Sequence, residues 1–384
     1  MQKKVGLFIV VSSIFQLSYG QQDSIPEKKC PLHFEASYVG DVYTNAVGGL
    51  KRGGGYMGMG NLTIGFDTEK ARWWKGGSFF INGATIHGKS LSENFTGDLQ
   101  VASNIDAGTH IYLHELWIKQ KFKEFSFTIG VQDLNAEFMV SENGAEFINS
   151  SFGVPSGVSG NIPVPVFPLT GPGIFVKWDV NDMFSWQTAV FDGNQTPFED
   201  NPYNLRWKFC KNDGLLAVTE FHANTRIKNL EGIYKLGSFY HSGFKEFNVE
   251  SQCMDYVFRH NYGFYALIDQ TVRYNEAKNK KIGLFAQAVF CPKNKHAYYL
   301  GFGADYYGIF SKKGKDMSGL AVAGLDLHKA SHKHETILEL YYKWRFNENF
   351  AIQPDIQYIV NPSGTDAKLP DALVGILRLH INFR

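Results

Sequence analysis

The chain has 384 residues, of which 38 are basic and 37 acidic, and its formal net charge is +1. This near-neutral balance gives no support to nucleic-acid binding. The length allows one large barrel or two ordinary domains, and the 15% aromatic content, with 32 Phe and 19 Tyr, is typical of barrels that carry aromatic girdles at two membrane interfaces.

The N-terminus has the pattern of a secretory signal peptide. Lys3 and Lys4 precede an apolar run from Val5 to Ile14, and Ser18-Tyr19-Gly20 places small residues at the two cleavage-recognition positions. The apolar run is shorter than the roughly 20 residues that a membrane-spanning helix needs. We therefore predict a signal peptide, a short N-terminal segment and one exported barrel domain, over residues 1–20, 21–33 and 34–384.

The cysteines are few: Cys30, Cys210, Cys253 and Cys291. Exported chains form disulfides, and four cysteines allow three pairings, so the sequence leaves open whether any of them pair. No two of them have the spacing of metal ligands. We expect neither a metal nor a cofactor.

Stretches that alternate apolar and polar residues recur along the rest of the chain. In the last one, from Leu373 to Phe383, Leu377 and Phe383 fall on one face, while Arg378 and His380 fall on the other. A period of two, with aromatic and β-branched side chains, predicts β-strands. The other alternating stretches are residues 62–66, 125–131, 174–180, 205–209, 338–346 and 350–360.

These strands predict an all-β fold, a transmembrane antiparallel β-barrel. In lipid every backbone donor and acceptor must be paired within the protein, and a closed barrel achieves this. Asn181-Asp182 and Asn347-Glu348-Asn349 fit short turns, and Pro354 belongs at a bulge or a strand end because it lacks an N–H. The length suits sixteen strands of about 9–11 residues, although fourteen or eighteen fit almost as well. A soluble β-sandwich or β-helix would not need apolar faces repeated along the whole chain.

The alternation stops over residues 132–173. A connection of this length is usually functional. It contains no Lys or Arg and has a rigid proline-rich run from Asn161 to Pro168. We expect it either to fold into the lumen and narrow the pore, or to cover the barrel mouth.

Polar side chains of this loop are the candidates for contacting a solute, because hydroxyl groups need paired donors and acceptors. Arg206, with Lys208 and Lys177, is expected on inward strand faces opposite the loop. For each loop residue the alternative is a hydrogen bond that stabilises the loop, and Phe147, Phe152 and Phe167 are expected to pack the loop against the wall. The candidate residues are Asp133, Asn135, Glu137, Glu142, Asn143, Glu146, Asn149 and Arg206.

The central segment, GVQDLNAEFMVSENGAEFINSSFGVPSGVSGNIPVPVFPLTGPG, resembles that of the carbohydrate-selective porins of the OprB family. Further resemblance lies in WQTAVFDGNQ, YKLGSFYHSG, GFYALIDQTV and IQPDIQYIVNPSG, in the family's order. The resemblance implies a sixteen-stranded barrel through which monosaccharides diffuse across an outer membrane. It also implies charged and aromatic side chains at a constriction, which cannot be matched here residue by residue.

We therefore expect a passive porin for monosaccharides such as glucose in the outer membrane of a Gram-negative bacterium. Its partners would be carbohydrates, outer-membrane lipid and lipopolysaccharide, and the chain would be a monomer or a homotrimer. A general, poorly selective porin is the first alternative. A barrel enzyme acting on lipid or glycan would need a nucleophile–base pair or paired carboxylates that the sequence does not show, and a non-transporting adhesin would have a blocked lumen.

Overall fold

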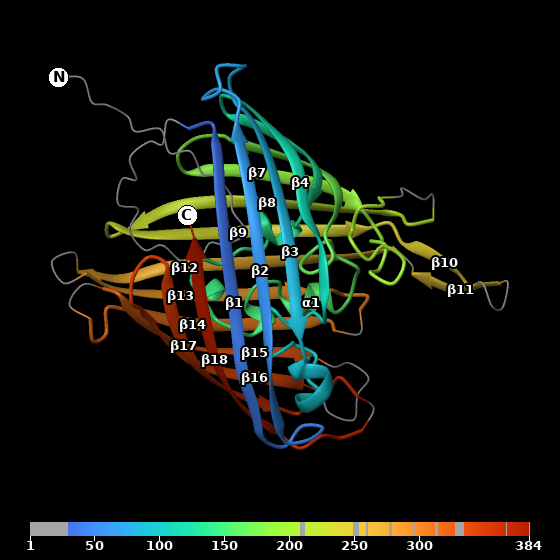
Figure 1. Cartoon of the computed structure of the whole chain (residues 1–384), viewed down its shortest axis with the longest axis vertical. Coiled ribbons are helices and arrows are strands. Elements are labelled where there is room, and N and C mark those ends of the chain that lie inside the picture. The colour runs from blue at the N-terminus through green and yellow to red at the C-terminus, as the bar shows by residue number, and fades with distance from the viewer. Residues whose placement is uncertain are drawn as a thin grey trace.

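Figure 1 shows the computed structural model of the chain, a strongly sheared barrel with long strands. The structure describes residues 30–207, 212–248, 253–258, 260–275, 279–294, 296–311, 314–326, 334–365 and 367–383. The predicted signal peptide, most of the predicted segment 21–33, Lys208 and Cys210 lie outside the described residues. Cys30 and Cys291 are free thiols, and nothing is described for the side chain of Cys253.

The described strands form one closed barrel of sixteen, in which every neighbouring pair is antiparallel and β1 closes against β18. The predicted fold class and strand number are thereby confirmed. The barrel strands are β1 (Leu32–Val47), β2 (Gly53–Asp67), β3 (Gly77–Gly88), β4 (His110–Phe122), β5 (Phe125–Gln132), β6 (Gly171–Asp179), β7 (Phe184–Asp192), β8 (Leu215–Ile227), β9 (Leu230–His241), β12 (Asn261–Asn275), β13 (Lys280–Phe290), β14 (Tyr298–Tyr307), β15 (Asp316–Asp326), β16 (His334–Arg345), β17 (Phe350–Val360) and β18 (Ala372–Phe383).

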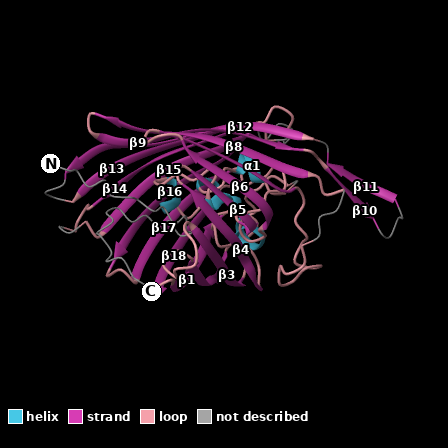
Figure 2. Cartoon of the chain, turned by 90° about the horizontal axis from the view of Figure 1, so that it is seen from above, coloured by secondary structure: helices cyan, strands magenta, loops and turns pink. Residues whose placement is uncertain are grey.

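The remaining described elements lie in the connections. Strands β10 (Phe244–Asn248) and β11 (Cys253–Phe258) form a separate hairpin that projects to one side of the barrel (Figure 2). The short helices are η1 (Ser92–Thr96), η2 (Leu134–Ala136), η3 (Gly144–Glu146), η4 (Ser150–Phe152) and α1 (Ser156–Ser159). In the described part of the chain, no helix has the length and apolarity to cross a membrane.

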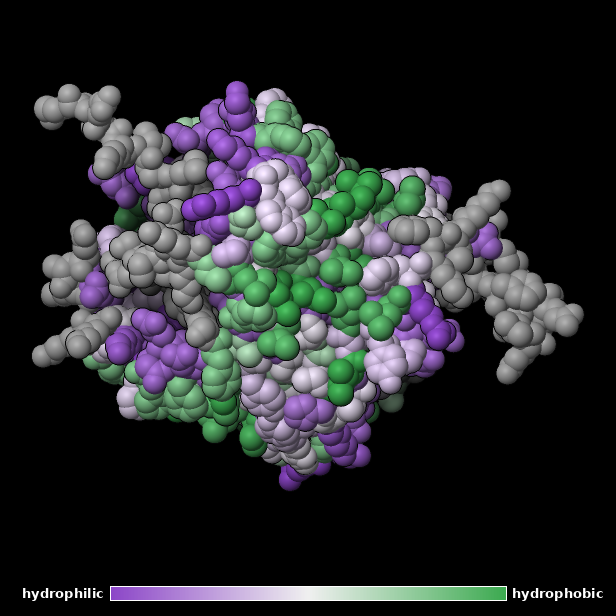
Figure 3. Space-filling view, turned by 45° about the horizontal axis from the view of Figure 1, so that its top comes forward, coloured by the Kyte–Doolittle hydropathy of each residue, from purple (hydrophilic) through white to green (hydrophobic). Residues whose placement is uncertain are grey.

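Alternation along each strand separates an apolar outer wall from a polar inner wall. On β18, Leu373 and Leu377 are exposed on the outside, whereas Arg378 and His380 are buried on the inside. The same pattern leaves large apolar side chains exposed all around the barrel, such as Leu62 on β2 and Phe302 on β14. Hydrophobic residues accordingly gather over the wall in Figure 3, with hydrophilic residues toward the ends.

Connection lengths distinguish the two ends of the barrel. Short turns such as residues 123–124, 228–229 and 346–349 lie at one end, and long loops over residues 89–109, 133–170 and 193–214 lie at the other. In outer-membrane barrels the short turns face the periplasm and the long loops face outward. We name the two ends accordingly.

Two local expectations were wrong. Residues 205–207 do not form a strand but belong to the outer loop 193–214, where Asn201 accepts hydrogen bonds from the N–H groups of Leu205 and Arg206. Pro354 lies within β17 and keeps its pairing with Leu377 of β18. The pairing of β17 with β16 is interrupted at Gln353 and Pro354, where the missing N–H of proline removes a ladder bond.

Candidate functional site: a loop-lined pore

The loop over residues 133–170 runs inside the barrel along the inner wall. Its backbone N–H groups donate to wall carboxylates: Met139 to Glu220 Oε2 at 2.9 Å, Asn143 to Asp269 Oδ1 at 3.0 Å and Ile148 to Glu339 Oε1 at 2.5 Å. These acceptors lie on β8, β12 and β16. The loop leaves β5 and is thus bound to the far side of the lumen.

Aromatic packing and further hydrogen bonds hold the middle of the loop. Phe147 and Phe152 are fully buried, and both rings contact Phe285 of β13, with centroids 5.4 and 5.8 Å away. The Tyr299 hydroxyl donates to the Ser151 carbonyl at 2.8 Å, and Gln287 Nε2 donates to the Phe152 carbonyl at 2.8 Å. The predicted packing role of Phe147 and Phe152 is confirmed.

A second inward segment lies between β3 and β4, within residues 89–109, and the sequence did not predict it. The N–H groups of Leu99 and Gln100 donate to the Glu335 carboxylate of β16, and Ser103 Oγ donates to Asp41 Oδ2 of β1 at 2.7 Å. The two inward segments also bind each other. Asn104 N–H donates to the Ile148 carbonyl and Ser150 N–H to the Val101 carbonyl, both at 2.9 Å.

On the periplasmic side the loop borders an open vestibule of about 690 Å³. Glu142 lies there in contact with solvent, although the barrel wall encloses it on most sides. This burial raises the pKa of Glu142, and the nearby Asp269 acts in the same direction, against Lys281 and Lys235. The vestibule is lined by Glu142, Asn143, Asp182, Met183, Asn224, Thr225, Arg226, Glu231, Gly232, Ile233, Asp269, Gln270, Thr271 and Lys281.

The inner wall of β2 to β4 combines aromatic rings with unpaired polar atoms. Phe80 and Trp117 are half-buried register partners whose rings stack with centroids 4.8 Å apart at 20°. Both amide atoms of Asn61, Oδ1 of Asn82 and the Tyr112 hydroxyl are buried without a hydrogen-bond partner among the described residues. Leaving such groups unpaired costs about 1–3 kcal/mol each, so they favour contact with water or with the hydroxyls of a solute.

The family model described as "Carbohydrate-selective porin, OprB family" matches residues 51–383. The chain belongs to this family. It is 23% identical to Porin B of Pseudomonas aeruginosa over 403 residues, covering 91% of this chain and 87% of that protein. The family match confirms the resemblance seen in the central segment and identifies the chain as an outer-membrane porin of a Gram-negative bacterium.

Solved structures show the same fold. The high-pH structure of Pseudomonas putida OprB has a TM-score of 0.81 at 22% identity, over 92% of this chain and 94% of that one. The low-pH structure of Pseudomonas putida OprB gives 0.61 at 18% identity, over 92% and 93% of the two chains. At these identities the comparison supports the architecture of this OprB-family barrel and no individual residue role.

Most of the predicted loop residues turn out to hold the loop of this porin in place. Asp133 and Asn149 cap η2 and η4, each accepting from the backbone N–H two residues later. Asn135 Nδ2 donates to the Phe138 carbonyl, and Asn143 Nδ2 donates to Asp269 Oδ1, both at 3.0 Å. Buried Glu146 lies 2.9 Å from Lys343 Nζ and 3.4 Å from Arg345 Nη2.

Glu137 and Glu142 are the two loop acids that keep contact with solvent. Glu137 lies 3.9 Å from Lys119 Nζ, beside Trp117 on β4, whereas Glu142 lies in the vestibule. Arg206 does not join them, because it is exposed in the outer loop 193–214. Lys177 does lie on the inner face of β6, where it pairs with Asp179 at 3.6 Å.

Sequence reasoning missed the aromatic pair and the unpaired polar groups of the β2–β4 wall. Asn61, Asn82 and Trp117 each occupy inward positions of alternating strands. A period-two pattern identifies such positions, but it does not show which inward residues keep polar atoms without a hydrogen-bond partner. The described residues contain no cluster of His, Cys, Asp and Glu that would hold a metal ion.

Proposed function

We propose that this porin lets monosaccharides such as glucose diffuse passively through the passage between its inward loop and the β2–β4 wall. The supporting observation is the stacked Phe80–Trp117 pair beside the unpaired polar atoms of Asn61 and Asn82. The apolar face of a pyranose ring suits an aromatic side chain, while its hydroxyls need donors and acceptors. Transport also requires contacts weak enough for release, which a few hydrogen bonds satisfy.

Charged groups flank this passage. Lys119, two residues after Trp117 on β4, pairs with Glu137, and Glu142 and Lys281 line the vestibule on the periplasmic side. Both signs are present, so a neutral polar solute finds donors and acceptors along the path. A poorly selective general porin would use the same lumen without a preference for sugars.

The test is liposome swelling with glucose, maltose and a neutral amino acid of similar size to glucose. Glucose is expected to enter faster than the amino acid, and Trp117→Ala is expected to reduce that preference several-fold. Trp178→Ala is the matched control, because Trp178 is exposed on the outer face of β6. Equal entry of glucose and the amino acid into wild-type liposomes would leave a general porin.

We infer a channel rather than an enzyme. The inner-wall carboxylates Glu220, Asp269, Glu335 and Glu339 accept backbone N–H groups of the inward segments, which supports a role for these four in holding the segments in place. Conductance in planar bilayers separates a porin from a blocked adhesin. A barrel that passes neither ions nor sugars would contradict the proposal.

A further inference from the structure

The outer wall over β2 to β6 carries an apolar groove of about 450 Å³. It begins beside Phe66 and Phe79 near the periplasmic turns and continues across the barrel wall to Pro172 and Trp207. Crossing five strands at about 4.8 Å per neighbouring pair gives a length of about 19 Å. One leaflet of a bilayer is about 15 Å deep, half of a 30 Å hydrocarbon core. The end at Pro172 and Trp207 lies beside the outer loops, so the part of the groove beside Phe66, Phe79 and Ile118 is the part that an acyl chain of the periplasmic leaflet would occupy.

An aromatic cluster marks the periplasmic end of this groove. The Phe66 ring lies 4.9 Å from Trp73, and the Phe79 ring lies 6.0 Å from Trp74. Trp74 Nε1 donates to Gln120 Oε1 of β4 at 2.8 Å, which fixes its ring, yet Trp73 and Trp74 remain 65% and 44% exposed. Exposed tryptophans with one polar atom are characteristic of the level of lipid headgroups.

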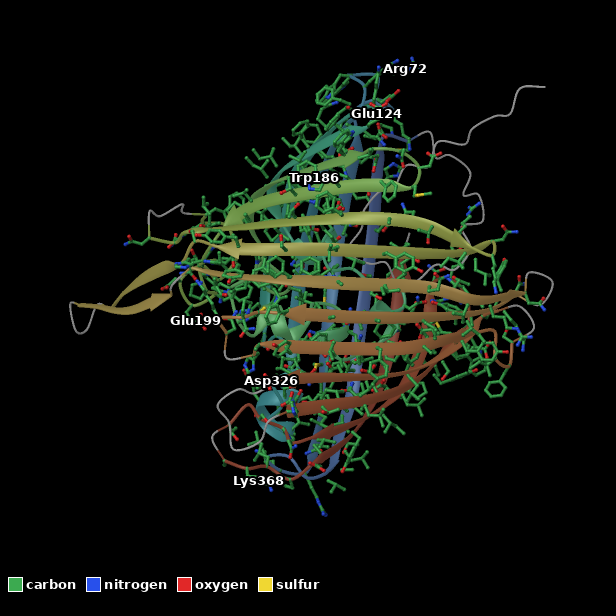
Figure 4. All side chains as sticks on the ribbon, turned by 180° about the vertical axis from the view of Figure 1, so that it is seen from behind. Arg72, Glu124, Trp186, Glu199, Asp326 and Lys368 are labelled. Carbon is green, nitrogen blue, oxygen red and sulfur yellow. The ribbon has the colours of Figure 1, made fainter. Side chains whose placement is uncertain are left out.

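Beyond these tryptophans the β2–β3 and β4–β5 turns carry excess positive charge. Figure 4 shows their tips, Arg72 and Glu124, at one extremity of the molecule. The two turns join where Lys121 N–H donates to the Gly76 carbonyl at 2.8 Å. Five basic residues stand against three acidic ones here: Lys70, Arg72, Lys75, Lys121 and Lys123 against Asp67, Glu69 and Glu124.

None of these five cations forms an ion pair within the part of the chain that the structure describes, and all but Lys70 are exposed. By contrast, Arg226 at the end of β8 pairs with Glu231 at 3.2 Å. Each unpaired cation at a membrane surface raises the affinity for anionic lipid by a factor of about five. The apolar groove, the tryptophans and the cations thus follow one another in the order of a lipid's chain, interface and headgroup.

We propose that this corner is a binding site for one anionic phospholipid of the periplasmic leaflet. An acyl chain occupies the groove beside Phe66 and Phe79, Trp73 and Trp74 lie at the level of the ester groups, and the phosphate meets Arg72 and Lys75. The site lies on the outer face of the wall and the sugar passage on the inner face, although Phe80 and Trp117, whose rings stack on the inner face, also border the groove.

Native mass spectrometry of the detergent-purified porin tests the proposal, with phosphatidylglycerol and phosphatidylethanolamine of identical chains added in equal amounts. One phosphatidylglycerol is expected to be retained at least about fivefold over phosphatidylethanolamine. Arg72→Gln/Lys75→Gln is expected to remove this preference. Lys228→Gln/Lys315→Gln removes the same charge from other exposed periplasmic turns and is expected to preserve it.

The part of the site that binds the acyl chain is tested by its own pair of variants. Ile118→Trp fills the groove and is expected to lower retention of both lipids, whereas Leu300→Trp changes an exposed outer residue of β14, away from the groove, and leaves retention unchanged. Folding of every variant is checked by heat-dependent gel mobility. Equal retention of the two lipids by the wild type overturns the proposal, as does equal loss in the test and control variants.

Discussion

Asp269 is the wall residue with the most hydrogen bonds to the inward loop, and its removal is predicted to free one part of that loop. It accepts from Ser141 Oγ at 2.8 Å, from Glu142 N–H at 3.2 Å, and from Asn143 N–H and Nδ2, both at 3.0 Å. Hydrogen bonds to a charged group contribute about 1.5–3 kcal/mol each, but shared donors do not add fully. We take about 3 kcal/mol as the local stabilisation lost in Asp269→Ala.

A loss of about 3 kcal/mol corresponds to a roughly 150-fold rise in the population of the locally open loop. Hydrogen exchange with mass spectrometry reports it directly, since the amides of Glu142 and Asn143 exchange only when open. The Met139 amide, held by Glu220 instead, is the internal reference and is expected to exchange at the wild-type rate. Asp269→Asn keeps the oxygen that accepts three of the four bonds, so its effect is expected to be at least tenfold smaller.

Two results would refute this reasoning. Unchanged exchange at Glu142 and Asn143 in Asp269→Ala would show that the aromatic packing of Phe147 and Phe152 alone holds the loop. A uniform acceleration that includes Met139 would show that the loop moves as one unit, so that no single carboxylate controls a part of it.

Further predictions concern charge. Glu146→Gln leaves buried Lys343 without its counterion and is expected to lower the free energy of unfolding by about 3–5 kcal/mol in guanidinium titrations. Glu231→Gln, which breaks the exposed pair with Arg226, is expected to lower it by less than about 1 kcal/mol. Equal losses in the two variants would contradict the argument that the buried pair matters more. An ordinary glutamate has a pKa of about 4.3. Because burial raises the pKa of Glu142, this carboxyl takes up its proton at a higher pH than that. Cation preference in planar bilayers is therefore expected to fall on acidification already above that pH, and Glu142→Gln is expected to abolish this step; a pH profile identical in wild type and variant would exclude Glu142 from the ion path.

The barrel could be predicted because lipid imposes a simple rule on sequence. Each strand must present apolar residues to the membrane at every second position, and β18 displays this from Leu373 to Phe383. The rule also explains one error. Leu205 and Trp207 alternate with polar neighbours in the same way, yet they lie in a loop in which Trp207 covers one end of the outer groove.

The site was harder to predict, because the polarity of a loop side chain does not show whether its hydrogen-bond partner is a solute or the protein itself. Asp133, Asn143 and Asn149 carry the donors and acceptors that a sugar needs, but in the structure they bond to the loop and to the wall. Ile148 and Glu339 meet across almost two hundred residues of sequence, and that meeting depends on closure of the barrel. No local pattern contains this information, and the same holds for Glu335 and the second inward segment.

The wall carboxylates bind the inward segments largely through backbone N–H groups, although Asp269 also accepts from the side chains of Ser141 and Asn143. Every residue except proline supplies an N–H, so this part of the attachment does not depend on which side chains the loop carries, whereas the packing of Phe147 and Phe152 and the pairing of Glu146 with Lys343 do. Side chains such as those of Glu137 and Glu142 are thereby free to change over evolution without displacing the loop. A porin built in this way can acquire a new solute preference through single substitutions while its channel keeps the same shape.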